Sequence, residues 1–173
     1  MENTIIRRAE RKDHQALCSL YVEFHEFHAL RLPDRLHSLG ENDRIDRVQM
    51  IGNFEAIMAD EDSVILIAEN PHQPVGMAHV MVRQDESNPA VVSRKYAYLQ
   101  SLLVLESYRG FRIGNQLLNS AEQWAKEKGA AEMRLGTWEF AESPLGFYES
   151  AGYRTLKRTL VKCLESDRHA NGI

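Results

Sequence analysis

The chain has 173 residues, of which 43% are hydrophobic and 27% are charged, and its formal net charge at pH 7 is −4. This length suits one domain with a buried core, and the composition is that of an ordinary globular protein. The acidic balance argues against nucleic-acid binding, which needs a basic surface. The longest apolar run, Val64 to Ala68, is too short to span a membrane, and the polar N-terminus does not resemble a signal peptide. We therefore expect a cytoplasmic protein that contacts neither nucleic acid nor membrane.

No repeat, linker or low-complexity tract divides the chain. We expect one domain over residues 1–165, followed by a flexible tail over residues 166–173. Cys18 and Cys163 lie far apart and outside any Cys-x-x-Cys spacing, so we interpret them as reduced thiols and not as a disulfide.

The first third of the chain predicts one strand and two helices. Thr4–Glu10 is β-branched at its start and fits a strand. Asp13 can cap a helix from about His14 to Leu30, in which apolar side chains recur every three or four residues. A second helix is expected from about Asp43 to Ala59.

The remainder alternates between strands and helices. The predicted strands are Ser63–Asn70, Pro74–Gln84, Ser93–Glu106 and Ala131–Trp138, with one or two closing strands in Tyr153–Glu165. A helix with Ile113, Leu117 and Ala121 on one face should end at Gly129, and a short helix should occupy Ser143–Gly152. This order predicts a mixed sheet with helices on its faces, an α/β or α+β fold.

The stretch SYRGFRIGNQLL, Ser107 to Leu118, carries the strongest local signal. It combines Gly110 and Gly114 with Arg109 and Arg112 directly before an amphipathic helix. Backbone N–H groups at such a helix N-terminus favour an anion, and Arg112 stands where a phosphate loop would most want another glycine. The stretch matches neither the Walker nor the dinucleotide-binding pattern. From these residues alone, a pyrophosphate site and a purely structural turn both remain open.

A longer segment, YLQSLLVLESYRGFRIGNQLL, resembles the acyl-CoA-binding segment of the GCN5-related N-acetyltransferase (GNAT) family, whose pattern is Arg/Gln-x-x-Gly-x-Gly/Ala. Downstream, WEFAESPLGFYESAGY is similar to the second half of that family, with Phe147-Tyr148 followed by Gly152-Tyr153. The resemblance extends from about Thr4 to Leu164. Two departures are Arg112, which replaces the usual glycine, and Ala141, which stands where many members carry an asparagine that contacts the cofactor.

The resemblance implies a single GNAT-type domain. Its sheet would be mixed and mostly antiparallel, with six to seven strands, helices on both faces and splayed central strands. Acetyl-CoA would enter between strands four and five, where the backbone of Leu102 and Val104 pairs with the pantetheine arm beside Leu103. An amide near Val104 would polarise the thioester carbonyl. The pyrophosphate would be held by the loop residues Arg109, Gly110, Phe111, Arg112, Ile113, Gly114 and Asn115.

The same resemblance implies residues for the chemistry. Tyr148 would be the general acid that protonates the leaving CoA thiolate, although a tyrosine on a short helix is also a common packing residue. Glu106 is the candidate general base. Tyr98 or Gln100 are alternatives that would hold a water molecule, and His28 or His25 near the end of the first helix are further candidates. The acceptor site would include His25, His28 and Tyr98. His25 and His28 are spaced like a pair of metal ligands, but no third ligand is placed by the sequence, so we expect no metal.

The expected function is therefore acetyl-CoA-dependent transfer of an acetyl group to a primary amine of a small-molecule or peptide acceptor. A homodimer through the closing strands is compatible with the pattern. Two alternatives stay open, a non-catalytic acyl-CoA-binding module and an unrelated protein with a phosphate-bearing ligand.

Overall fold

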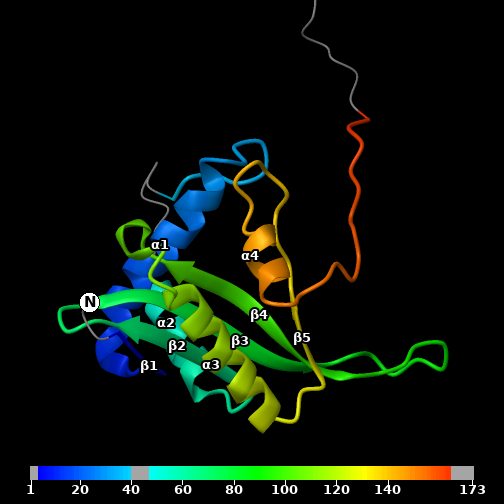
Figure 1. Cartoon of the computed structure of the whole chain (residues 1–173), viewed down its shortest axis with the longest axis horizontal. Helices are drawn as coiled ribbons and strands as arrows, with labels where there is room; N and C mark the ends of the chain where they lie inside the picture. Colours follow the sequence, from blue (N-terminus) through cyan, green and yellow to red (C-terminus); the bar gives the residue numbers. More distant parts are fainter. Residues whose placement is uncertain (1–3, 40–46, 165–173) are drawn as a thin grey trace, which may run out of the picture.

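The computed structural model describes residues 4–39 and 47–164 and contains one five-stranded sheet in the order β1-β2-β3-β4-β5 (Figure 1). Neighbouring strands are antiparallel, except that β4 and β5 are parallel. The strands are β1 Ile5–Arg8, β2 Ser63–Glu69, β3 Pro74–Gln84, β4 Lys95–Val104 and β5 Glu132–Leu135. The prediction of a mixed, mostly antiparallel sheet is confirmed, whereas the expected six to seven strands are too many.

The helices are α1 His14–Ala29, α2 Arg47–Ala59, α3 Ile113–Glu127 and α4 Leu145–Ser150, with two short 3-10 turns, η1 Arg11–Asp13 and η2 Glu106–Tyr108. The predicted start of α1 agrees with the structure, and α3 ends just before Gly129 as expected. The predicted start of the second helix, residues 43–46, lies outside the described residues. Gly129 has φ +76 directly after α3, a left-handed conformation that glycine adopts without strain and that ends the helix.

Two hydrophobic clusters form the core, one on each face of the sheet. Helices α3 and α4 cover one face, where Leu117, Trp124 and Tyr148 pack against the strands. Helices α1 and α2 cover the other face, where Leu17 and Phe54 do so. The expectation of helices on both faces is confirmed.

A β-bulge at Gln100 divides β4 into two parts. His79 of β3 is opposite Ser101, whereas the next residue, Val80, is opposite Leu99, so Gln100 has no partner on β3. One extra residue reverses the alternation of side chains along the strand. Leu99 therefore faces the α3 side before the bulge, and Leu102 faces the same side after it.

The segment that follows α4 departs from the prediction. We expected one or two closing strands in Tyr153–Glu165, but residues 154–164 are assigned to no strand, and all of them are exposed. Figure 1 shows this segment as an extended orange-to-red trace that runs away from the sheet. The pattern indicates strand propensity, and no strand within residues 4–39 and 47–164 pairs with this segment. The predicted tail, residues 166–173, lies outside the described residues.

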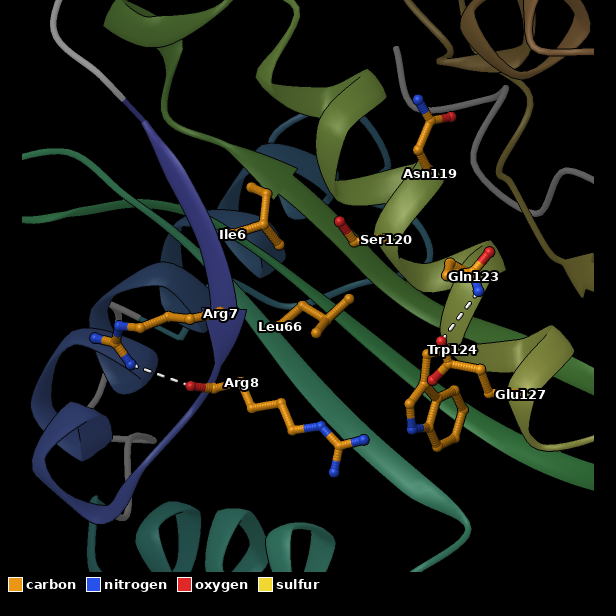
Figure 2. Close-up of a pocket in the computed structure, with 9 residues that line it drawn as sticks. All are labelled: Ile6, Arg7, Arg8, Leu66, Asn119, Ser120, Gln123, Trp124 and Glu127. Carbon is orange, nitrogen blue, oxygen red and sulfur yellow. Dashed lines mark hydrogen bonds between the residues drawn. The ribbon is translucent and has the colours of Figure 1, made fainter.

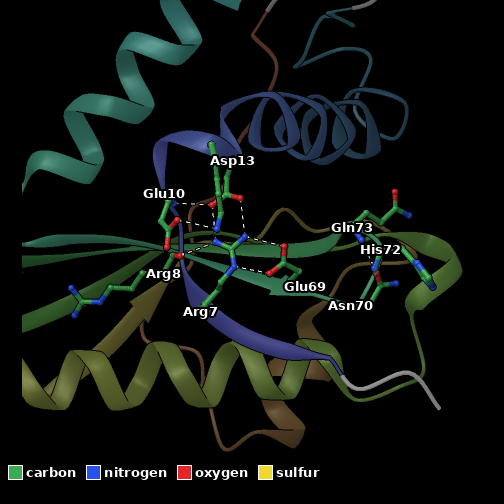
Figure 3. A network of polar contacts seen from close by, with 9 residues as sticks. Arg7, Arg8, Glu10, Asp13, Glu69, Asn70, His72 and Gln73 are labelled. Carbon is green, nitrogen blue, oxygen red and sulfur yellow. Dashed lines mark hydrogen bonds and ion pairs between the residues drawn. The ribbon is translucent and has the colours of Figure 1, made fainter.

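A network of charged side chains ties β1, η1 and β2 together (Figure 3). Arg7 donates two hydrogen bonds to the Asp13 carboxylate, at 2.7 and 2.8 Å, and two more to Glu69, at 2.7 and 3.1 Å. The Asp13 carboxylate also accepts the Glu10 backbone N–H at 2.8 Å, so it caps the short turn η1 and not α1. Hydrogen bonds from Arg7 lower the pKa of both Asp13 and Glu69.

None of the helices in the described part of the chain combines the length and the apolar character that a membrane crossing requires.

Candidate active site

The site is built where β4 and β5 separate. The two strands pair in parallel from Tyr96 to Leu99 of β4, and beyond that point β4 continues to Val104 without a partner on this edge among the described residues. The Leu105 N–H donates to Val75 O of β3 at 2.9 Å. Because backbone groups alternate between the two sides of a strand, the N–H and C=O groups of Leu102 and Val104 point away from β3. We call these four groups the open edge of β4.

The carbonyl oxygen of Val104 on the open edge is occupied by a side chain. It accepts a hydrogen bond of 3.1 Å from Arg109 Nε, and the Arg109 guanidinium lies 5.2 Å from the centre of the Phe27 ring of α1. Arg109 therefore bridges the phosphate-loop candidate, the open edge of β4 and the end of α1. The neighbouring Leu103 lies on the opposite face, in the α1–α2 cluster.

The loop between η2 and α3 contains two residues with positive φ, the conformation that favours glycine. Gly110 has φ +83, and Arg112 has φ 63 and ψ 13, which makes it the one non-glycine residue with positive φ in the described residues. The backbone of Arg112 is therefore in the left-handed conformation. This explains why glycine suits the position. The Arg112 side chain is exposed, and its carbonyl accepts the Gln116 N–H at 3.1 Å, the first bond of α3.

The beginning of α3 packs closely against both β4 and α4. Ile113 is buried, Asn115 and Phe111 are exposed, and a Cβ built on Gly114 would lie 3.5 Å from the Phe147 ring and 3.9 Å from Val104 Cγ2. A Cβ at these distances would be in ordinary van der Waals contact, so α3 starts close beside both the open edge and α4. This contact links the two segments of the sequence that carry the family resemblance.

Tyr148 follows Phe147 on α4 and is 8% exposed. Its ring contacts those of Phe147 and Tyr153, with centroid distances of 5.1 and 5.8 Å. Burial raises the pKa of Tyr148 to about 12, so its phenol stays protonated at neutral pH. Its hydroxyl has no hydrogen-bond partner among the described residues.

Two of the residues predicted for the acceptor site lie at the end of α1. His28 Nδ1 is 2.8 Å from the Phe24 carbonyl, which can only accept, so Nε2 is the acceptor nitrogen of the neutral ring. The His28 ring contacts Phe27 and Phe140 at centroid distances of 5.3 and 6.2 Å. His25 is instead 2.7 Å from the His37 carbonyl, which ties the helix to the chain that follows it.

The loop between β5 and α4 closes over the end of α1. Arg31 donates to Glu142 at 2.9 Å and stacks on Phe27 at 3.9 Å, and Phe27 also contacts Phe140 at 6.0 Å. Sequence reasoning missed this contact, because Arg31 and Glu142 lie 111 positions apart. The four-residue separation of Phe27 on α1 and Arg31 just beyond its end was the one local signal.

The other predicted residues lie on or beside β4. Tyr98 is half-buried, and a Cβ built on Gly136 would be 3.1 Å from its hydroxyl oxygen, so Tyr98 reaches the end of β5 where the strands separate. Glu106 is exposed in η2, and its backbone carbonyl accepts the Arg109 N–H at 3.1 Å. Ala141 is exposed in the loop that precedes α4.

A separate pocket lies at the other end of the sheet, between β1 and α3 (Figure 2). It has a volume of about 400 Å³ and is lined by residues such as Ile6, Arg8, Ser120 and Trp124. Gln123 and Glu127 on its wall are hydrogen-bonded to each other at 3.0 Å. The pocket contains none of the predicted site residues. Within residues 4–39 and 47–164, no group of His, Cys, Asp and Glu side chains is arranged to hold a metal ion.

Comparisons with known proteins agree with this arrangement. The model of the Acetyltransferase (GNAT) family matches residues 15–153. The chain therefore belongs to the GNAT family.

A protein of Bacillus subtilis (strain 168) that is assigned as an acetyltransferase is 31% identical over 91 residues, and the match spans 52% of each protein. The crystal structure of a tetramutant of the BH1408 protein from Bacillus halodurans superposes with a TM-score of 0.82 at 25% identity, and the match covers 92% of this chain and 99% of that one. The aminoglycoside N-acetyltransferase AAC(6')-Iy in complex with CoA superposes with a TM-score of 0.74 at 17% identity, covering 96% and 97%. These superpositions identify the fold, an acetyltransferase domain with a mixed sheet.

Proposed function

We propose that this protein is an acetyl-CoA-dependent N-acetyltransferase that transfers an acetyl group to a primary amine. The observation that carries the proposal is the open edge of β4, which leads directly to a helix N-terminus and lies beside Gly114 and α4. Membership of the GNAT family and a structural neighbour whose complex contains CoA support the same cofactor.

The pantetheine arm is proposed to bind along the open edge as an additional strand would. It offers amide donors and acceptors that match the N–H and C=O groups of Leu102 and Val104 on the open edge. Arg109 must release the Val104 carbonyl when the arm needs it, and its guanidinium then becomes free for a phosphate. The backbone N–H groups between Arg109 and Asn115, at the N-terminus of α3, would hold the pyrophosphate.

The proposed reaction is direct attack of the acceptor amine on the thioester carbonyl carbon. A C–N bond forms, the C–S bond breaks, and the sulfur takes a proton from the Tyr148 hydroxyl. A backbone N–H near Val104 would stabilise the negative charge that develops on the carbonyl oxygen. The raised pKa of Tyr148 keeps the donor protonated until the thiolate forms.

The amine must also lose a proton, and Glu106 is the proposed base. Its carboxylate follows the open edge by two residues and is exposed in η2. His28 is the second candidate, because the hydrogen bond at Nδ1 leaves Nε2 as a proton acceptor. A Glu106→Gln variant that loses the acidic limb of the pH–rate profile supports Glu106, and loss of that limb in His28→Gln supports His28 instead.

The acceptor is proposed to be a small-molecule or peptide amine that approaches from the end of α1. His28, Phe27 and Phe140 would form an aromatic wall there, with Tyr98 near the reacting atoms. His25 would act indirectly, because its ring nitrogen is engaged with His37. A cytoplasmic location fits this chemistry, since the cytoplasm supplies acetyl-CoA.

The decisive experiment is a thiol-release assay with acetyl-CoA and a chemically diverse panel of amines. The proposal requires at least one amine that stimulates CoA release and gains the mass of an acetyl group. If the protein binds CoA in a thermal-shift assay but acetylates nothing in the panel, the alternative of a non-catalytic acyl-CoA-binding module is favoured.

A further inference from the structure

The end of β3 carries an exposed arginine on the same face of the sheet as α1 and α2. Val80 and Val82 pack into the cluster beneath α3 and α4, so the alternating side chains of Met81 and Arg83 lie on the opposite face. The cluster beneath α1 and α2 includes Met77 but neither Met81 nor Arg83. Figure 1 shows that β3 and β4 continue beyond these two helices. Arg83 therefore lies on a part of this face that the helices leave accessible.

The Arg83 guanidinium is held in place without an anion. It lies 5.0 Å from the centre of the Tyr98 ring, and its Nη2 and Nε atoms are 2.8 and 3.2 Å from Met81 Sδ. A thioether sulfur is only a weak hydrogen-bond acceptor. Within residues 4–39 and 47–164, no Asp or Glu forms an ion pair with Arg83. The guanidinium is thus oriented by its neighbours, and its charge is left uncompensated by any of them.

The two nearest carboxylates on this face are engaged by another arginine. Asp85 accepts hydrogen bonds of 2.6 and 2.8 Å from Arg134 and a third, of 3.2 Å, from the backbone N–H of Arg94. Glu132 accepts Arg134 Nε at 2.7 Å. Hydrogen bonds from Arg134 also lower the pKa of Asp85, which keeps this carboxylate ionised and bound where it is. Neither acid is left to serve Arg83.

His79, four residues before Arg83 on the same face of β3, adds no charge at neutral pH. Burial, together with repulsion from the Arg83 guanidinium, lowers the pKa of His79 to about 4. The imidazole is therefore neutral at pH 7. Its Nε2 atom is buried and has no hydrogen-bond partner among the described residues. A ligand on this face would thus meet the charge of Arg83 beside a neutral imidazole.

Tyr98 connects Arg83 with the point at which β4 and β5 separate. Tyr98 pairs with Met81 on β3 and with Arg134 on β5, one residue before the parallel pairing ends at Leu99. The open edge begins at Leu102, further along the same strand. Arg83 itself is opposite Tyr96, so it lies on the far side of Tyr98 from the open edge. A molecule that reaches from the open edge across Tyr98 arrives at the guanidinium.

We propose that Arg83 binds a carboxylate or phosphate group of the acceptor, and that the acceptor is a primary amine with this anionic group several bonds from its nitrogen. The guanidinium stacked on Tyr98 keeps its N–H donors in one plane, which suits two parallel hydrogen bonds to such a group. An α-amino acid is too short, because its carboxylate is one carbon from the amine. The inference rests on the proposed acetyltransferase activity and specifies the class of its acceptor.

The test compares acceptors of equal shape that differ in charge. With acetyl-CoA, kcat/KM for 6-aminohexanoate should exceed that for 6-aminohexanamide by about tenfold, the scale of one charge-assisted contact at an accessible site. The difference should lie in KM, because the contact is remote from the reacting atoms. Parallel assays with 6-aminohexyl phosphate show whether phosphate or carboxylate is preferred, and glycine should be a poor acceptor.

Variants assign the preference to one side chain. Arg83→Gln should abolish the difference between 6-aminohexanoate and 6-aminohexanamide, and Arg83→Lys, which keeps the charge but not the planar fork, should retain part of it. Lys126→Gln on the exposed side of α3 makes the same change in net charge and should preserve the full preference. Because Arg83 is exposed, each variant should have the circular dichroism spectrum of the parent.

The possible failures can be told apart. If the best acceptors of a broad amine panel carry no anionic group, or if Arg83→Gln keeps the preference, then Arg83 does not bind the acceptor, although acetyl transfer itself stands. If the protein binds CoA but acetylates no amine at all, the acetyltransferase proposal is wrong and the acceptor assignment is overturned with it.

Discussion

Arg109 Nε donates a hydrogen bond of 3.1 Å to the carbonyl oxygen of Val104, on the one stretch of β4 that has no strand beside it. The side chain that opens the phosphate-binding loop therefore occupies a position that the pantetheine arm is proposed to use. Cofactor binding should therefore be coupled to loss of the Arg109–Val104 hydrogen bond, because Arg109 and the pantetheine arm cannot use the same lone pair of the Val104 oxygen at once.

The coupling predicts an opposite effect of one variant on two ligands. Arg109→Ala leaves Val104 O free, so S-acetylpantetheine, which lacks the pyrophosphate, should bind about threefold to tenfold more tightly, since no hydrogen bond has to be broken. The affinity for acetyl-CoA should rise less than the affinity for S-acetylpantetheine, or fall, because the variant lacks a cation for the phosphates of acetyl-CoA. Isothermal titration calorimetry measures both. Arg112→Ala is the control, and weaker binding of S-acetylpantetheine to Arg109→Ala would contradict the coupling.

Tyr148→Phe should lower kcat by about a hundredfold, the scale of a general acid, and leave the Kd of acetyl-CoA unchanged. The pKa of about 12 predicts that the activity of the parent has no loss from tyrosine ionisation below about pH 10. The matched control is Tyr153→Phe. It removes the hydrogen bond to Glu122 and should reduce stability with little change in kcat. Equal turnover of Tyr148→Phe and the parent in a single-turnover experiment would exclude the acid role.

Arg112 combines a left-handed backbone with a positive side chain, and two substitutions separate these properties. Arg112→Gly should raise the free energy of unfolding by about 1 kcal/mol, because glycine adopts positive φ without steric cost. Arg112→Ala should not raise the free energy of unfolding, because positive φ is as strained for alanine as for arginine. Both variants should bind CoA more weakly than the parent and with a smaller dependence on salt concentration. Equal affinities of parent and variants at low salt would show that the guanidinium does not contact the cofactor.

The Arg7 network makes a prediction about stability in acid. Asp13 is 5% exposed and shares the Arg7 guanidinium with Glu69, so Asp13→Ala should cost about 3 kcal/mol in urea unfolding, the scale for leaving a buried charge unpaired. Lys12→Ala removes an exposed ion pair with Glu10 and should cost less than about 0.5 kcal/mol.

The sign of the pH dependence follows from the lowered pKa values of Asp13 and Glu69. Both carboxylates stabilise the fold above their unfolded pKa of about 4, and that stability is lost as the pH falls through their lower folded pKa values. The difference between the parent and Asp13→Ala should therefore shrink below about pH 4. A difference that stays constant down to pH 3 would contradict the assignment.

Local patterns in the sequence predicted most of the elements, because their signals lie within a few residues. β3 has the predicted bounds, and α3 ends just before Gly129, as its sequence predicted. The pairing of Arg7 with Glu69 spans 62 positions, and no local pattern carries such a contact. The bulge at Gln100 was also missed, since its flanks are apolar and read as one continuous strand.

The closing strands show the opposite error. The residues after Tyr153 have the composition of a strand, yet a strand exists only where a second one offers hydrogen bonds. In the candidate site, Gly114 of the first motif lies beside the ring of Phe147 of the second motif. The two motifs did not predict the contact of Arg31 with Glu142, which depends on how the loop before α4 folds over α1.

The bulge at Gln100 also limits how this chain can change in length. Before it, the α3 face receives Leu99, and after it the same face receives Leu102, with Leu103 turned toward α1 and α2. Deleting Gln100 would remove the bulge and leave the pairs of Ser101 to Val104 with β3 unchanged. One residue inserted between Ser101 and Val104 would instead turn the rest of the strand to the opposite face and place apolar and polar groups on the wrong sides. Substitutions after the bulge should therefore be tolerated more readily than insertions of one residue, and Gln100 is the position at which β4 can be shortened.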